Sequence, residues 1–168
     1  MNPRAWELQR KYKTKTPFTG EDIAFAEAML DSTTILEQII GCNALLRTPC
    51  SEATQTRVVQ LLRGLCQKTL ISDSVYPPNL LLAFFKLPIG LITADEVFRE
   101  FAYRMVQSDT ANRINCLLVL ERLAFHNDAK AKELLARSVN DSEEQVRDGA
   151  KNCLERLANG IDVEQMLF

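Results

Sequence analysis

The sequence is poor in the residues that most metal and catalytic sites use. Its 168 residues include one histidine, His126, so a metal site built from several histidines is excluded. Its five cysteines are an odd number with no C-x-x-C pair, which argues against a zinc site and a secreted disulfide framework. Its six glycines form no G-x-G-x-x-G and no P-loop. We find no enzyme signature and expect no metal and no cofactor, although a Ser–His–Asp or Cys–His site whose members meet only in space stays open.

The sequence also lacks an excess of one charge and a long hydrophobic run. There are 20 basic and 22 acidic side chains, and the net charge of −2 argues against broad, non-specific nucleic-acid binding. The most apolar window, 79–92, is interrupted by Lys86, Pro88 and Gly90 and is shorter than the ~20 residues of a transmembrane helix. No apolar signal segment is visible at the N-terminus. Together with the free thiols, these features lead us to expect a cytoplasmic protein.

Amphipathic helical patterns fill almost the whole chain. In 143–158 the apolar residues Val146, Ala150, Cys153 and Leu157 recur at steps near 3.6, opposite a charged face. Such patterns predict helices over 21–30, 34–47, 52–71, 78–86, 94–107, 110–126, 129–139 and 143–158. We find no convincing strand, so the expected fold class is all-α, with short loops that favour antiparallel neighbours.

Several helix starts carry a hydroxyl residue followed three residues later by an acid or amide, which is the pattern of a capping box. The expected pairs are Thr34–Glu37, Thr93–Glu96 and Ser142–Gln145. Further N-caps are expected at Thr19, Ser51 and Asp109. His126 is expected at the C-terminal end of its helix, where the helix dipole favours it.

Two segments look like copies of one unit. Residues 113–124 read RINCLLVLERLA and residues 147–158 read RDGAKNCLERLA, with six of twelve positions identical at an offset of 34. The helices that precede them align as well. We interpret 94–126 and 128–160 as two repeated helical hairpins, with chance similarity between amphipathic helices as the alternative.

The stretch ELLARSVNDSEEQVRDGAKNCLERLA, residues 133–158, resembles a HEAT repeat of the armadillo-like helical superfamily. Asp141 stands where that unit has its turn aspartate, and Val146–Arg147 stands where its second helix opens. The resemblance implies a short right-handed stack of antiparallel helical hairpins, a HEAT- or armadillo-like solenoid, in which four units of about 40 residues account for the chain.

The resemblance weakens toward the N-terminus. The unit 94–126 matches in part, since Asn112 precedes Arg113 and Cys116 takes the place of an alanine. Over 21–92 the likeness is only architectural. We expect a single α-helical repeat domain over residues 20–160, a short tail over 161–168, and a basic N-terminal arm or cap over 1–19.

The segment 1–19 has five basic residues and one acidic residue, a net charge of +4. It is the only hint of nucleic acid, an acidic partner or an anionic membrane surface as a ligand. We favour a cap, in which Ala5, Leu8 and Tyr12 share one helical face and Trp6 anchors the segment.

Stacked helical hairpins leave an elongated polar face that suits a protein or peptide partner. The candidate contacts on that face are Arg113, Arg122, Arg147, Lys151 and Glu155. An ordinary solvated helix face explains them equally well. The leading hypothesis is a non-enzymatic protein–protein interaction module, acting as a scaffold, an adaptor or a regulatory subunit.

Two other functions stay open. One is a HEAT-like enzyme that acts on nucleic acid or as a lyase. The other is a dimeric helical adaptor, chaperone or inhibitor, with the apolar residues 80–92 as the homodimer face. In that case Phe84 and Phe85 are the partner contacts; the alternative is that they form a central core.

Overall fold

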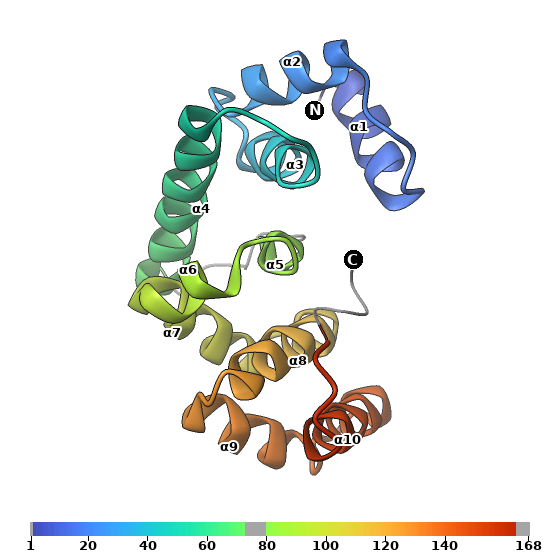
Figure 1. Cartoon of the computed structure of the whole chain (residues 1–168), viewed down its shortest axis with the longest axis vertical. Helices are drawn as coiled ribbons and strands as arrows, with labels where there is room; N and C mark the ends of the chain where they lie inside the picture. The colour runs from blue at the N-terminus through green and yellow to red at the C-terminus, as the bar shows by residue number, and fades with distance from the viewer. Residues whose placement is uncertain (1, 73–79, 164–168) are drawn as a thin grey trace. The chain divides into compact units, whose positions relative to one another are not determined.

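The computed structural model describes residues 2–72 and 80–163, and every regular element within them is helical (Figure 1). The elements are α1 (Pro3–Lys13), α2 (Gly20–Met29), α3 (Ile35–Leu45), α4 (Glu52–Ser72), α5 (Leu80–Phe84), α6 (Ile89–Ala94), α7 (Glu96–Arg104), the 3₁₀ turn η1 (Met105–Gln107), α8 (Thr110–Phe125), α9 (Ala129–Ser138) and α10 (Glu144–Ala158). The expected all-α class is confirmed. No helix in these ranges has the length and apolar character needed to cross a bilayer.

Most predicted helices are found within a few residues, and the one expected over 94–107 is found as α7 followed by η1, beginning at Glu96. Asp95 adopts an extended conformation (φ −101°, ψ 116°), and its side chain accepts a hydrogen bond from the Val97 N–H at 2.9 Å. Asp95 therefore ends α6 and caps α7. The helix predicted over 78–86 is found as α5, while residues 78 and 79 lie outside the described residues.

The expected capping boxes at Thr34, Thr93 and Ser142 are not formed, because Glu37 has other partners and because aspartates cap near the starts of α7 and α10. The Glu37 carboxylate accepts from the Asn2 N–H and the Ser32 hydroxyl, at 2.8 and 2.7 Å. Asp95 replaces Thr93, and before α10 the Asp141 carboxylate accepts from the Glu143 N–H at 2.9 Å. The N-caps predicted at Thr19, Ser51 and Asp109 and the C-terminal position of His126 are confirmed.

The chain divides into two compact units, Met1–Lys86 and Leu87–Phe168. In the first unit α3 packs against α1, α2, α4 and α5. Gly41 lets α2 and α3 approach closely, since a Cβ atom at this position would lie 2.8 Å from the Ala26 carbonyl oxygen. Ile39 and Cys42 on the same helix are completely buried.

The basic N-terminal segment forms helix α1 of the first unit. Asn2 caps it, and Ala5 and Leu8 are buried as the cap interpretation requires. The Lys11 ammonium donates to the Asp22 carboxylate at 2.8 Å, which ties α1 to α2. The expectation that Trp6 anchors the segment is wrong: its side chain is 55% exposed, because Ala5 and Leu8 turn the other face of α1 inward.

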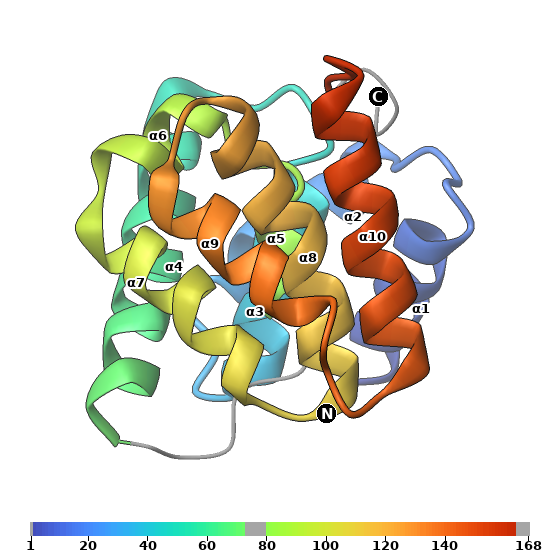
Figure 2. The same cartoon turned by 90° about the horizontal axis from the view of Figure 1, so that it is seen from below.

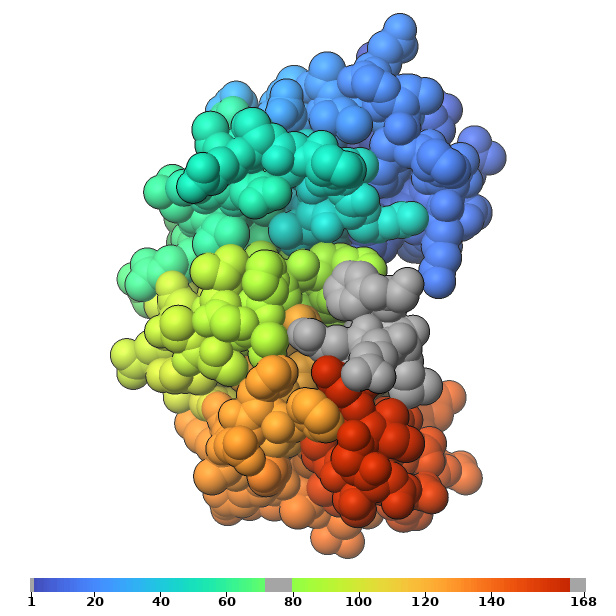
Figure 3. Space-filling view, viewed as in Figure 1, coloured from blue at the N-terminus to red at the C-terminus, as the bar shows by residue number. Residues whose placement is uncertain are grey.

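In the second unit α8 packs against α6, α7, η1, α9 and α10. Its side chains are buried around most of the helix, and the buried set includes Leu120, Glu121, Arg122 and Leu123. The outer side of α10 lies at the surface (Figure 3, red).

Candidate partner-binding surface

Helices α8 and α10 are parallel neighbours that carry the two copies of the LERLA sequence (Figure 2). The Cys153 thiol lies 3.9 Å from the Leu117 carbonyl oxygen, and Arg156 contacts Glu121. The two contacts join residues 36 and 35 positions apart. The contact nearer the C-terminal end of α8 is also the one nearer the C-terminal end of α10. The two copies therefore lie side by side in the same orientation.

The first contact between the hairpins is made by Arg113, near the start of α8. Its Nη2 donates to Asp141 Oδ1 at 3.1 Å, and its Nε lies 3.1 Å from Asp141 Oδ2. Asp141 is the residue that the HEAT resemblance places in the turn. Arg113 Nη1 also donates to the Ser108 carbonyl at 2.9 Å, so one guanidinium joins its own helix start to the following turn.

The second contact is made by Leu117, in the middle of α8. A Cβ atom at Gly149 would lie 2.8 Å from Leu117 Cδ1, so the glycine leaves room for the leucine side chain between the helices. Cys153 is buried one turn further along α10, and burial raises the pKa of its thiol to about 12. This thiol therefore packs as a neutral apolar group.

The third contact is made by Glu121, whose side chain has no exposed surface. Arg156 on α10 donates to both of its carboxylate oxygens, and the hydrogen bond to Glu121 raises the pKa of Arg156. We call Arg113, Leu117 and Glu121 the α8 row. They lie four residues apart on one face of α8, and the whole row is occupied by the α9–α10 hairpin.

Shifting the α8 row by the repeat offset of 34 gives Arg147, Lys151 and Glu155, which we call the α10 row. Lys151 and Glu155 are exposed and Arg147 is half-buried. Arg147 Nη1 donates to the carbonyls of Asp141 and Ser142, which repeats the Arg113–Ser108 bond. Within residues 2–72 and 80–163, no carboxylate pairs with Arg147 as Asp141 pairs with Arg113.

Some of the predicted contact residues are buried inside the protein, and others are accessible at its surface. Arg122 and Phe84 are not surface residues: Arg122 is 1% exposed and donates to the Leu87 carbonyl at 2.8 Å, and Phe84 is completely buried. The burial of Phe84 and the half-burial of Phe85 give no support to the homodimer face over 80–92, which stays a prediction. Lys151 and Glu155 remain accessible.

Glu121 and Arg156, which form a two-point contact between the hairpins, were not among the predicted contact residues. Both belong to LERLA, and the corresponding residues Arg122 and Glu155 make different contacts or none in the described part of the chain. The offset of 34 makes position 121 equivalent to 155, so it gives no direct signal for the pair that forms with the next residue, Arg156.

A second polar surface lies on the outward face of α1. Trp6, Arg10 and Lys13 follow one another at helical spacing, and all three are exposed. The neighbouring basic residues are engaged internally: Lys11 binds Asp22, and Arg4 lies 4.8 Å from the centre of the Phe25 ring. The outward cations of α1 are therefore fewer than the sequence suggests.

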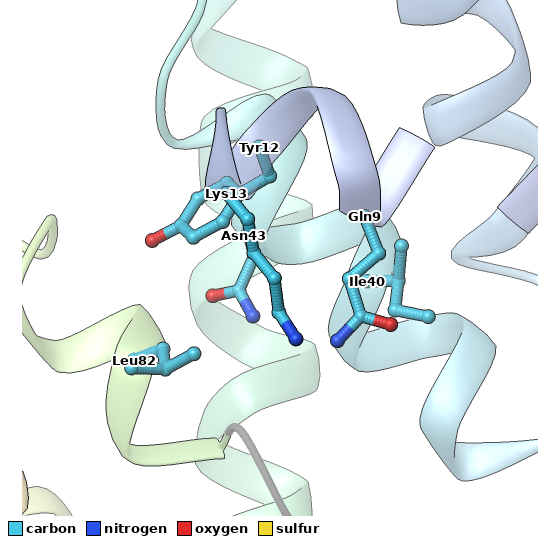
Figure 4. A pocket seen from close by; sticks show the side chains of 6 residues that line it. All are labelled: Gln9, Tyr12, Lys13, Ile40, Asn43 and Leu82. Atoms are coloured by element: carbon cyan, nitrogen blue, oxygen red, sulfur yellow. The ribbon is translucent and has the colours of Figure 1, made fainter. Parts of the chain in front are cut away.

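The pocket between α1, α3 and α5 is too small for a ligand (Figure 4). Gln9, Tyr12, Lys13 and Asn43 bring polar groups to it, but its volume of about 10 Å³ is close to the least that holds one water molecule. A wider hollow of about 270 Å³ is lined by Asn2, Phe25, Ala28, Met29, Asp31, Ser32 and Glu37.

The two carboxylates that line this wider hollow already have partners, since Asp31 forms an ion pair with Arg57. Glu37 accepts hydrogen bonds from Ser32 and Asn2, which hold its pKa below the usual value. Elsewhere in the described residues, no three His, Cys, Asp or Glu side chains are grouped closely enough to hold a metal ion. Comparison with known proteins found no matching family model, no similar curated protein and no similar solved structure.

Proposed function

We propose that the chain is a non-enzymatic protein-binding module that holds its partner on the α10 row. In this proposal the α7–α8 and α9–α10 hairpins are stacked repeats of a short HEAT- or armadillo-like solenoid. The parallel contact between α8 and α10 supports that arrangement. The side-by-side faces of such stacks form extended surfaces on which partners bind.

One observation carries the proposal: the α8 row is covered by a helical hairpin, whereas the equivalent α10 row is accessible. The two rows share an arginine at the first position and a glutamate at the third. At the second position the α10 row has Lys151 where the α8 row has Leu117. A charged side chain at this position suits a face that is exposed to water. A polar row with a fixed arginine suits a partner that binds and leaves rather than a permanent core.

Site-specific photo-crosslinking tests the proposal on the full chain. A benzophenone amino acid is placed at Lys151 or Glu155, and at Gln145 or Gln60 as exposed controls on another face of α10 and on α4. We expect one protein to be captured at positions 151 and 155 and not at the controls. The captured protein, once purified, must also bind the unmodified chain.

The proposal is overturned if all four positions capture the same proteins, or if none captures a protein that rebinds. A dominant crosslink at Gln60 would assign binding to the first unit instead.

A further inference from the structure

The α8 row shows what kind of structure fits such a surface. Three contacts hold the α9–α10 hairpin on it: Asp141 to Arg113, Gly149 to Leu117, and Arg156 to Glu121. The acid comes from the turn before the helix, and the arginine follows fifteen residues later, near the end of the helix. The small residue between them allows the close approach.

The α10 row offers the same polar groups at the same spacing. Arg147 has its Nη1 on two carbonyls of its own turn, as Arg113 has on Ser108. Glu155 is exposed, at the position where Glu121 receives an arginine. Lys151 stands at the position equivalent to Leu117, and its ammonium pairs with Asp148 at 3.2 Å, which leaves its aliphatic stem as the apolar part of this position.

From this equivalence, and resting on the proposed function, we infer that the partner is a helical hairpin that presents an acid–small–arginine pattern. Its turn acid pairs with Arg147, its small residue faces the stem of Lys151, and an arginine fifteen residues after the acid pairs with Glu155. Arginine is the suited cation, because its planar fork matches a carboxylate at two points.

A second copy of this chain does not supply that pattern from its folded state. Its own Asp141 and Arg156 are bound to Arg113 and Glu121, and Glu121 is completely buried. Offering them to another copy requires the α9–α10 hairpin to leave α8. The partner is therefore a different protein, and exchange of hairpins between copies is an outcome that the molecular mass in solution reveals.

The inference is tested by giving the full chain a hairpin of known pattern. A second copy of residues 127–160 is inserted directly after residue 160, which keeps the 34-residue offset. The matched control carries 34 Gly and Ser residues at the same place. We expect the midpoint of thermal unfolding to rise by at least 4 °C over the control, in a monomer by light scattering.

Charge exchange then tests the pairing itself. Glu155→Arg should remove at least half of the gain, and Arg→Glu at the copied position 156 should restore it in the same chain. Glu133→Arg on α9 is the control for charge reversal at an exposed acid and should leave the gain unchanged.

No gain over the Gly/Ser control, a gain only in a dimer, or a gain that Glu155→Arg leaves intact would each overturn the inferred pattern. None of these results would overturn the proposed function if a protein is still captured at Lys151 and Glu155. Conversely, if no protein is captured but the charge exchange restores the gain in stability, the inferred pattern holds and the proposed function is overturned.

Discussion

Arg156 on α10 forms a two-point ion pair with Glu121 on α8: Nε donates to Oε1 and Nη2 donates to Oε2, each at 2.7 Å. The Glu121 side chain is 0% exposed and that of Arg156 is 24% exposed. A buried carboxylate depends on its partner, because the cost of taking it out of water is offset chiefly by these two charge-assisted bonds. The pair fixes the register between the two hairpins.

Replacing Arg156 alone should therefore be far more damaging than replacing the pair. Arg156→Met should lower the free energy of unfolding by about 3–5 kcal/mol, since it leaves a buried charge without a partner. The double variant Glu121→Leu with Arg156→Met should lie close to the parent. Urea denaturation of the three proteins checks this, and a single-variant loss below about 1 kcal/mol would mean that Glu121 is solvated.

Two glycines in helices should respond to alanine in opposite directions. Gly41→Ala places a Cβ atom against the Ala26 carbonyl, a backbone atom that cannot rotate away, and should cost about 1–3 kcal/mol. Gly64 lies within α4 with nothing within 4 Å of the added atom, so Gly64→Ala should stabilise by up to about 1 kcal/mol. Thermal unfolding of the two variants measures the contrast, and equal shifts would contradict the close packing of α2 and α3.

The Lys11–Asp22 pair predicts a specific dependence on pH. The hydrogen bond from Lys11 is the main reason that the pKa of Asp22 is lowered from 3.8 to about 2. The folded state therefore holds the carboxylate more strongly than the unfolded chain does. The stability it contributes is present above pH 4 and is lost as the pH falls from about 4 to 2.

Asp22→Asn should accordingly destabilise the protein by about 1 kcal/mol at pH 7. The difference from the parent should stay constant down to pH 5 and shrink below pH 4. Urea midpoints of both proteins at pH 7, 5 and 3 give the comparison. A difference that grows toward pH 3 would have the wrong sign.

The five cysteines should differ sharply in reactivity. Four are buried, and burial raises the pKa of Cys42 and of Cys116 to about 12, so their thiolates are scarce at neutral pH. Cys50 is half-buried. A thiol reagent at pH 8 should modify Cys50 first in the folded protein and the other four only on unfolding, as mass spectrometry would show. Rapid labelling of Cys116 would contradict the packing of α8.

Trp6 is the single tryptophan, so its fluorescence reports directly on the outward face of α1. The first unit has ten basic and eight acidic side chains, a net charge of only +2. We expect duplex DNA at 50 mM salt to leave the Trp6 emission unchanged, because few basic side chains on the outward face of α1 are available to bind phosphate. A salt-dependent change in emission would instead assign nucleic-acid binding to α1.

The two LERLA segments, 34 residues apart, predict a pair of similar neighbouring helices, and α8 and α10 do lie side by side. The repeat could not predict burial, because identical LERLA strings place Glu121 in the interior and Glu155 in solvent. That difference depends on what stacks against each helix rather than on the helix itself. The break at Asp95 was missed for a local reason: Thr93 and Asp95 are both good N-caps, and packing decides between them.

The most direct test of the account is the affinity of the full chain for the protein captured at the α10 row. Isothermal titration compares the parent chain with Glu155→Lys and with Glu133→Lys, which reverses an exposed charge on α9. We expect Glu155→Lys to weaken binding at least tenfold with an unchanged unfolding midpoint, while Glu133→Lys binds like the parent. Equal affinities for all three chains would contradict the account.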